Sequence, residues 1–132
     1  MIEALSELAR LNENALVAAP AWLRQAHGLL HDRFSENLAL DEIAASVGVH
    51  PAHLARSFRR CYGSTVGEYQ RRLRVEYASR QLTETRTSIL SIALTAGFAD
   101  QSHFSRTFRN HTGLTPGKFR AALALSKRDD PL

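Results

Sequence analysis

Two arginines, Arg56 and Arg106, occupy matching places in the chain and are the side chains best suited to recognising a ligand. Each stands midway between two large apolar residues that are four positions apart. The planar guanidinium group offers a fork of N–H donors that matches a phosphate or the O6 and N7 acceptors of guanine. A single arginine of this kind is more often an ordinary surface residue, so the argument depends on the repeated setting of the pair.

The charge of the chain is unevenly distributed, although its net value is only +4. Residues 1–49 carry three basic and seven acidic side chains, a net charge of −4, and Asp129 and Asp130 add two more acidic groups at the end. Residues 50–128 carry fourteen basic and four acidic side chains, a net charge of +10. Of the 17 basic residues, 15 are arginine. Such a segment favours a polyanion with defined geometry, and a solvated surface is the alternative that composition alone leaves open.

One amphipathic phrase occurs twice, about fifty residues apart. The two segments are GVHPAHLARSF (48–58) and GFADQSHFSRTF (97–108). Ile43, Ala44 and Gly48 match residues 49 positions later, and one residue is then inserted in the turn. At an offset of 50 the matching pairs are Leu54 and Phe104, Arg56 and Arg106, Phe58 and Phe108, Gly63 and Gly113, Thr65 and Thr115, and Gly67 and Gly117. A self-similarity of this length indicates a duplicated structural unit.

Apolar residues recur at helical spacing along nearly the whole chain, and no alternating β-branched run is long enough for a strand. The sequence therefore predicts an all-α fold of about seven helices plus an extra N-terminal helix. The predicted helices cover residues 2–18, 21–34, 40–47, 51–62, 66–83, 89–96, 101–112 and 115–125. They group into an N-terminal helix or linker (1–19), a first helix–turn–helix subdomain with a long linking helix (20–84), a second helix–turn–helix subdomain (85–125) and a frayed tail (126–132).

Capping residues support several of these helix ends. Thr65 and Glu68 form a capping box at the start of the long helix, and Asp100 is a good N-cap for the helix that follows it. Gly63 and Gly113 suit helix C-termini that require a left-handed residue.

The helices predicted at 51–62 and 101–112 each separate an apolar side from a polar one. At about 100° per residue, Phe58 and Cys61 fall within about 40° of Leu54 and form a buried stripe. The opposite side carries small and basic residues, which are Ala52, Arg56 and Arg59 in the first helix and Ser102, Arg106 and Arg109 in the second. A helix with such a face can lie in the major groove of DNA while the short helix before it crosses the backbone.

Both reading helices belong to one chain. Most helix–turn–helix proteins dimerise to place two reading helices about 34 Å apart, which is one turn of DNA. The linking helix of roughly 18 residues would span about 27 Å, which is the right scale for two successive major grooves.

The segments LDEIAASVGVHPAHLARSFRRCYGSTVGEYQRRLRVEYASRQL and SILSIALTAGFADQSHFSRTFRNHTGLTPGKFR carry a family pattern. The second contains the run G-F-x-D-x-S-x-F-x-R-x-F followed by G-x-T-P-x-x-F-R. Over roughly residues 21–121 the chain resembles the C-terminal DNA-binding domain of AraC/XylS-type transcriptional regulators. The resemblance implies seven helices, two helix–turn–helix units and binding to asymmetric sites in double-stranded promoter DNA, most often as an activator with RNA polymerase as a partner.

The resemblance also assigns roles to single residues. Base reading would fall on Ala52, Ala55 and Arg56 in the first unit and on Gln101, Ser102, Ser105 and Arg106 in the second. Phosphate contacts would fall on Arg59, Arg60, Arg109 and Lys118. The chain departs from the family where His50 replaces a frequent serine cap and where Ala39 replaces a preferred serine or threonine. Because alanines offer only methyl groups, the first unit is expected to read thymine methyls and to depend on its arginine.

The sequence predicts no catalytic residue, no cofactor and no metal site. His27 and His31 have a spacing that can bind zinc, but no third ligand is evident, so surface or semi-buried histidines are the preferred interpretation. The single cysteine, Cys61, is predicted to be a small core residue.

Several alternatives stay open at this level. The chain could be the DNA-binding appendage of a larger enzyme, for which a reactive cysteine would be the mark, or a helical protein–protein adaptor. Residues 2–18 could belong to a stand-alone regulator, could be the remainder of a longer protein whose effector or dimerisation domain is missing, or could be an unstructured leader. The absence of a signal peptide and of an apolar run of about 18 residues predicts a cytoplasmic protein without a membrane contact.

Overall fold

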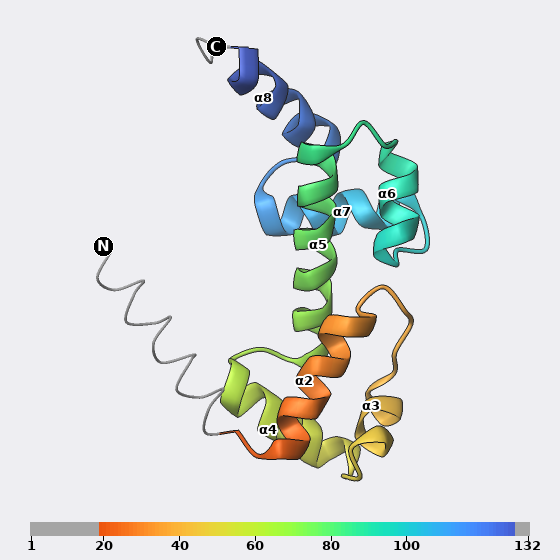
Figure 1. The fold of residues 1–132 in the computed structure, drawn as a ribbon, viewed down its shortest axis with the longest axis vertical. Helices are drawn as coiled ribbons and strands as arrows, with labels where there is room; N and C mark the ends of the chain where they lie inside the picture. Colours follow the sequence, from red (N-terminus) through yellow and green to blue (C-terminus); the bar gives the residue numbers. More distant parts are fainter. Residues whose placement is uncertain (1–18, 129–132) are drawn as a thin grey trace, which may run out of the picture. The chain divides into compact units, whose positions relative to one another are not determined.

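The computed structural model describes residues 19–128, and these contain seven α-helices and no strand (Figure 1). The helices are α2 (Ala21–Arg33), α3 (Leu40–Ser46), α4 (Pro51–Tyr62), α5 (Val66–Glu84), α6 (Ile89–Ala96), α7 (Gln101–Thr112) and α8 (Pro116–Arg128). The all-α prediction is confirmed, and its helix limits agree within one residue except at the end of α8, which continues to Arg128. The predicted helix at 2–18 and residues 129–132 lie outside the described residues. No described helix is long and apolar enough to cross a membrane.

The described residues form two compact units. The first unit comprises residues 19–33 and 38–70, and the second comprises residues 34–37 and 71–128. The boundary lies inside α5, so this helix contributes its first turns to one unit and the rest to the other. The subdomain limits expected from the sequence, 20–84 and 85–125, stay a prediction.

The core of the first unit lies among α2, α3 and α4, which contact one another. Each helix contributes side chains with no exposed surface, which are Leu23, Ala26 and Leu30 from α2, Ile43 and Ala44 from α3, and Leu54 and Phe58 from α4. In α2 the buried residues recur every three or four positions, which is the spacing that places them on one side of a helix.

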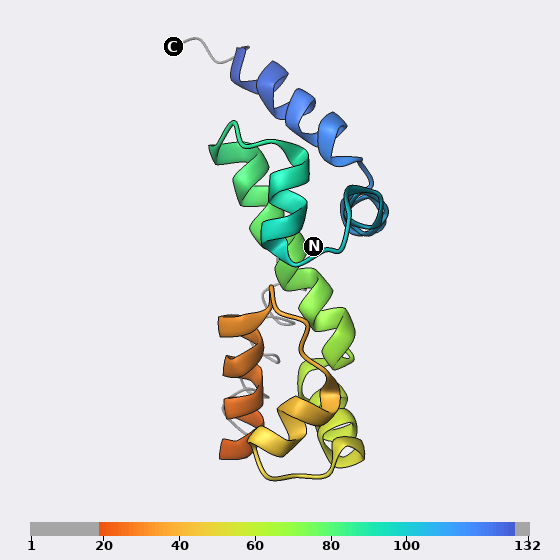
Figure 2. The same cartoon turned by 90° about the vertical axis from the view of Figure 1, so that its right-hand side faces the viewer.

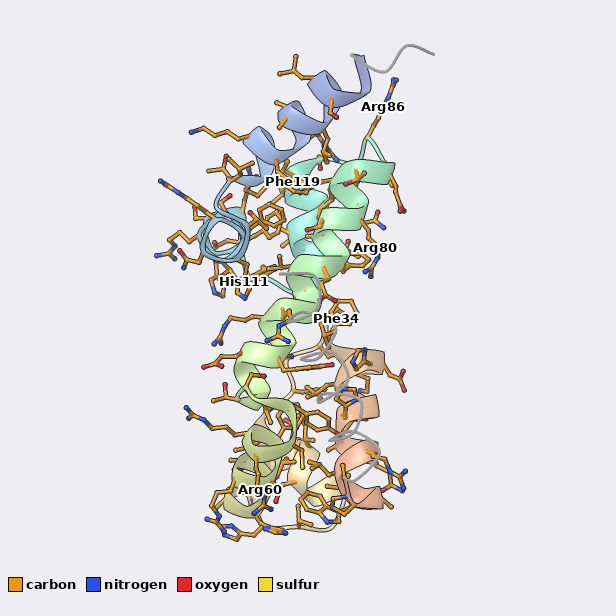
Figure 3. The ribbon with its side chains drawn as sticks, turned by 90° about the vertical axis from the view of Figure 1, so that its left-hand side faces the viewer. Phe34, Arg60, Arg80, Arg86, His111 and Phe119 are labelled. Atoms are coloured by element: carbon orange, nitrogen blue, oxygen red, sulfur yellow. The ribbon has the colours of Figure 1, made fainter. Side chains whose placement is uncertain are left out.

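The core of the second unit is built by α5, α6 and α7. Its buried residues are Val75, Ala78, Leu82, Ile92, Ala93, Ala96, Phe98, Phe104 and Phe108. Figure 2 shows α6 beside the second half of α5, with α7 seen end-on. Phe119 of α8 packs against this cluster with its ring centroid 5.2 Å from that of Phe108, in an edge-to-face arrangement (Figure 3). Such aromatic pairs add about 0.5–1.5 kcal/mol beyond the area that they bury.

Burial along α4 and α7 follows the same pattern at an offset of 50 residues. Leu54, Ser57 and Phe58 are buried in α4, and Phe104, Thr107 and Phe108 are buried at the matching places in α7. The repeated sequence therefore gives α4 and α7 the same pattern of buried and exposed positions.

One sequence prediction needs correction, because Cys61 is only half-buried rather than part of the core. Cys61 lies in the last turn of α4, which ends one residue later at Tyr62, whereas Leu54 and Phe58 of the same stripe are fully buried.

Side-chain caps fix the starts of five helices, α4 to α8. The Thr65 and Glu68 capping box is present, with the Glu68 amide donating to Thr65 Oγ1 at 3.1 Å and the Thr65 amide donating to the Glu68 carboxylate at 3.4 Å. Asp100 Oδ1 accepts from the His103 amide at 2.7 Å, and Ser88 Oγ accepts from the Ser91 amide at 3.1 Å.

Unlike these, α3 begins without a side-chain cap at Ala39, in line with the departure noted in the sequence. His50 does cap α4, since its Nδ1 accepts from the Ala52 amide at 3.1 Å.

A short segment after α2 belongs to the second unit because Arg74 holds it there. Arg74 Nε donates to the carbonyl of Phe34 at 2.8 Å, and its terminal nitrogen donates to the carbonyl of Glu36 at 3.0 Å. The same guanidinium group lies 5.6 Å from the centre of the Phe98 ring. The segment is thereby brought against the turn that contains Gly97.

Gly97 is the C-cap of α6, and Gly48 follows Val47, the C-cap of α3; both glycines have positive φ, 103° at Gly97 and 73° at Gly48. A β-carbon on Gly97 would collide with the backbone of Ser35, whose Cα would be 2.9 Å away, whereas nothing lies within 4 Å of a β-carbon placed on Gly48.

We expect Gly48→Ala to lower the free energy of unfolding by about 1–2 kcal/mol, which is the cost of the left-handed backbone conformation. Gly97→Ala should cost more, because backbone must also move. Urea unfolding of the two variants measures this difference, and equal losses would contradict the contact with Ser35.

Candidate nucleic-acid interface

The outward side of α7 carries the residues that were predicted to read bases in the second unit. Gln101, Ser102 and Arg106 are exposed, and Ser105 is half-buried. The helix begins at Gln101 because Asp100 caps it, so the polar residues lie in its first two turns. Their amide, hydroxyl and guanidinium groups can all form hydrogen bonds with base edges.

The outward side of α4 differs in composition. Arg56 is exposed, while Ala52 and Ala55 are half-buried and offer only methyl groups. Each of these two helices is rotated in the same way relative to the core of its own unit. Residues 53, 56, 59 and 60 are exposed in α4, and the matching residues 103, 106, 109 and 110 are exposed in α7.

The predicted phosphate contacts are exposed as well. Arg59 and Arg60 lie in the last turn of α4, where Figure 3 shows Arg60, and Arg109 lies at the equivalent place in α7. Lys118 is exposed in the first turn of α8. Its backbone amide donates to Oγ1 of Thr115 at 3.3 Å, and Thr115 is the counterpart of Thr65 in the second repeat.

The arginines on these two faces have no partner in the part of the chain that the structure describes. Within residues 19–128, no hydrogen bond or ion pair engages the side chains of Arg56, Arg59, Arg60, Arg106 and Arg109. Their donors are therefore available to an external acceptor without breaking a contact in the folded chain. Each guanidinium group carries a positive charge, so these two faces are positive.

Two other arginines, Arg74 and Arg120, have structural roles that sequence reasoning missed. Arg120 Nε donates to the carbonyl of Leu82 at 3.3 Å, and its terminal nitrogen donates to the carbonyl of Thr85 at 3.2 Å. A cation at these carbonyls stabilises the C-terminal end of α5. No local signal in the sequence could identify it, since the partners lie 38 and 35 residues away.

His27 and His31 meet at one tyrosine hydroxyl in the first unit. The Nε2 atoms of His27 and His31 lie 2.8 Å and 2.7 Å from the hydroxyl oxygen of Tyr69. His27 also stacks on Tyr62, with ring centroids 4.5 Å apart. His27 is half-buried and His31 is exposed, so the two histidines form part of an aromatic cluster that holds α2 against the start of α5.

Burial lowers the pKa of His27, and the neighbouring His31 lowers it further. The hydroxyl of Tyr69 can donate only one proton, so it suits one ring that accepts and one that donates. Protonation of His27 in the folded state would place a positive charge at a half-buried position beside His31.

Comparison with known proteins agrees with the repeated helix–turn–helix arrangement of α3 with α4 and of α6 with α7. The family model described as a helix-turn-helix domain matches residues 43–122. The probable transcription factor PqrA of Proteus vulgaris is 43% identical over 86 residues, which cover 65% of this chain and 70% of PqrA. The HTH-type transcriptional activator AarP of Providencia stuartii is 34% identical over 91 residues, which cover 69% of this chain and 67% of AarP. The bifunctional transcriptional activator/DNA repair enzyme AdaA of Bacillus subtilis is 32% identical over 99 residues, 75% of this chain but only 47% of AdaA.

Solved structures share the fold. An AraC-type DNA-binding domain-containing regulator from Chromobacterium violaceum is 36% identical with a TM-score of 0.71, covering 84% of this chain and 95% of that one. The C-terminal domain of AraT from Geobacillus stearothermophilus is 26% identical with a TM-score of 0.77, covering 80% and 88%. The DNA-binding domain of the transcriptional factor AdpA, solved with a target DNA, has a TM-score of 0.77 at 23% identity, covering 81% and 96%, and shows the likeness of fold.

A duplicated helix–turn–helix unit, two outward arginine faces and these relatives define the class of protein. The chain belongs to the AraC family of helix–turn–helix transcriptional regulators. The resemblance stated from the sequence is confirmed, while the roles of single residues stay predictions.

The lowered pKa of His27 predicts how the stability of the first unit depends on pH. A histidine has a pKa of about 6.5 in an unfolded chain, so the unfolded state binds the proton more readily than the folded state does. We expect the free energy of unfolding to be greatest above that pH and to fall as the pH drops through the lowered pKa of His27. Fluorescence of Trp22, the sole tryptophan, reports on this unit during urea unfolding between about pH 8 and pH 5.5.

The variant His27→Gln should weaken this pH dependence, because glutamine does not titrate. The control His103→Gln removes an exposed histidine of the other unit and should keep the wild-type dependence. An unchanged slope in His27→Gln would show that the cluster around Tyr69 does not penalise protonation.

Proposed function

We propose that this regulator binds double-stranded DNA sequence-specifically by inserting α4 and α7 into two successive major grooves. The observation that carries the proposal is the matched outward position of Arg56 and Arg106, each opposite a buried stripe and each without a partner among residues 19–128. An arginine in this position can donate two parallel hydrogen bonds to guanine O6 and N7 or to a phosphate. Two such helices in one chain would recognise an asymmetric site without the need for a dimer.

The two units read DNA with different chemistry in this proposal. In the second unit Gln101, Ser102, Ser105 and Arg106 would form hydrogen bonds with base edges. In the first unit the methyl groups of Ala52 and Ala55 would contact thymine methyls, and Arg56 would supply the directional hydrogen bonds. Because small side chains let a helix backbone approach a surface closely, α4 could lie deep in its groove.

Backbone contacts would fix the register of both helices. Arg59, Arg60, Arg109 and Lys118 are exposed and can pair with phosphates on either side of the reading residues. Such contacts carry affinity rather than sequence preference, and each makes binding more sensitive to salt.

The regulatory output is proposed from the relatives. AarP is named a transcriptional activator, and AdpA was solved with a target DNA, so activation from a promoter site is the outcome we propose here. An activator acts through RNA polymerase, which we propose as the partner in the cytoplasm. Because AdaA and other relatives extend well beyond the matched segment, we also propose that effector or dimerisation functions reside in a further domain of the regulator.

A larger enzyme is the second candidate, since AdaA combines a similar segment with a repair activity. In this chain the sole cysteine, Cys61, lies half-buried near the end of α4, within the helix that we propose to read DNA. A helix-bound thiol beside the DNA-reading face is poorly placed to accept a group from a substrate, so we propose a regulator without enzymatic activity of its own.

Arg106→Ala tests the base-reading role in the second unit. Loss of a guanidinium that pairs with guanine should weaken binding to the cognate duplex by about 1–3 kcal/mol and relax the preference at one base pair. Fluorescence anisotropy with the cognate site and with single-base variants measures both effects. Arg80→Ala is the matched control, because Arg80 is an exposed arginine of α5 outside the proposed interface (Figure 3). An Arg106→Ala variant with wild-type affinity and preference would remove the assignment.

Selection of bound duplexes from a random pool tests the two-groove arrangement. We expect a motif in two unlike halves with centres about 10 base pairs apart, because successive major grooves on one side of DNA have that spacing. Selection with Arg56→Ala should erode one half of the motif and keep the other. A single uninterrupted half-site in the wild type would show that only one helix reads bases.

A further inference from the structure

A groove in the first unit lies directly beside Arg56. It has a volume of about 420 Å³ and is lined by Leu38, Leu40, Ala55, Arg56, Arg59, Thr65, Val66, Gly67 and Gln70. Ligand sites for small organic molecules have volumes of roughly 300–1,000 Å³, so the groove is large enough to receive one. The predicted DNA contacts do not account for the whole groove, because six of its nine lining residues lie outside α4 and have no predicted base-reading or phosphate role.

The lining combines an apolar floor with a positive rim. Leu38, Leu40 and Val66 supply aliphatic surface that is half-buried, and Arg56 and Arg59 supply two guanidinium groups without partners in residues 19–128. A neutral hydrophobic ligand would leave these charges unpaired, and an inorganic anion would gain nothing from the leucines.

The start of α5 adds to the positive potential at the same place. Its capping residue and first two helical residues, Thr65, Val66 and Gly67, line the groove. The N-terminal end of a helix carries a partial positive charge that favours an anion. Glu68, whose carboxylate accepts a hydrogen bond from the Thr65 amide, is not part of the lining, so the lining itself holds two positive side chains and no negative one.

The second repeat indicates that this apolar lining is not a requirement of the fold. The arginines recur there as Arg106 and Arg109, but only part of the apolar lining recurs. Leu38 and Ala55 of the first unit are replaced by the polar residues Thr87 and Ser105, while Val66 is replaced by Pro116, which is fully buried. Leu40 does have an apolar counterpart, Ile89, which packs against the core of its own unit. The groove is therefore a property of the first unit that the duplication alone does not explain.

We propose that this groove binds a small amphipathic organic anion. The apolar body of the ligand lies over Leu38, Leu40 and Val66, and its carboxylate pairs with Arg56 and Arg59. Because Arg56 cannot pair with a carboxylate and with DNA at the same time, the ligand competes with DNA for the first unit. Only this competition rests on the proposed function, since binding of the anion needs no DNA.

Phenylbutyrate is a suitable probe, because it joins an aromatic body to a carboxylate through a short aliphatic chain. A titration followed by backbone-amide NMR, without DNA, should shift the signals of Ala55, Val66 and Gly67 in a saturable way. Phenylbutanol, which lacks the charge, and butyrate, which lacks the ring, should each bind about tenfold more weakly or worse. The same loss is expected for phenylbutyrate with the double variant Arg56→Gln/Arg59→Gln.

The repeat offers a matched control for that variant. Arg106→Gln/Arg109→Gln removes the same charge from the equivalent helix of the other unit and should leave the affinity for phenylbutyrate within about twofold of the wild type. The proposed site is overturned if both double variants weaken phenylbutyrate binding equally or if phenylbutanol binds as tightly as phenylbutyrate. It is also overturned if the shifted NMR signals are confined to the second unit or if phenylbutyrate does not bind at all.

Competition is then measured with a duplex selected from the random pool. Saturating phenylbutyrate should weaken the binding of that duplex about tenfold or more, and the loss should vanish in Arg56→Gln/Arg59→Gln, compared with that variant's own affinity. Unchanged DNA affinity in the presence of bound phenylbutyrate would overturn the competition and leave the anion site standing. If no duplex is selected, the proposed function fails, while the titration without DNA still decides whether the groove binds an anion.

Discussion

Burial of two large apolar side chains, one helical turn apart, fixes the rotation of each reading helix about its own axis. Leu54 and Phe58 in α4, like Phe104 and Phe108 in α7, have no exposed surface. With about 100° between successive residues, the position midway between each pair must face away from the core. The arginines that stand there are exposed for this reason, and every functional property discussed above depends on that rotation.

Fifteen arginines are present in the sequence, but they perform at least two different tasks. Arg74 and Arg120 donate to backbone carbonyls of distant segments and act as internal connectors. Those on the outward sides of α4 and α7 have no such acceptor among the described residues. The first group adds stability to the second unit, and the second group leaves its donors to an external anion. Local sequence context does not separate the two groups, because each connector finds its acceptor far along the chain.

Duplication has produced two units with the same helix geometry and different surfaces. The pattern of burial, the left-handed glycines and the outward arginines recur, while the outward side of α4 is poor in hydrogen-bonding groups and the start of α7 is rich in them. The first unit also has the groove beside Arg56 and the aromatic cluster around Tyr69. A shared backbone thus tolerates separate specialisation, since the core residues that fix helix rotation lie on the opposite side from those that vary.

The sequence by itself determined the helices, most of their caps, the repeat, the family and the outward side of both reading helices. These features depend on helical periodicity and on capping pairs within three residues of each other, such as Thr65 with Glu68. Only the tertiary structure decided that Arg74 binds the carbonyl of Phe34, that His27 meets Tyr69, and that Cys61 is half-buried. The first two contacts join residues 40 and 42 positions apart. No periodic pattern encodes such pairs, because they form only where separate helices pack against each other.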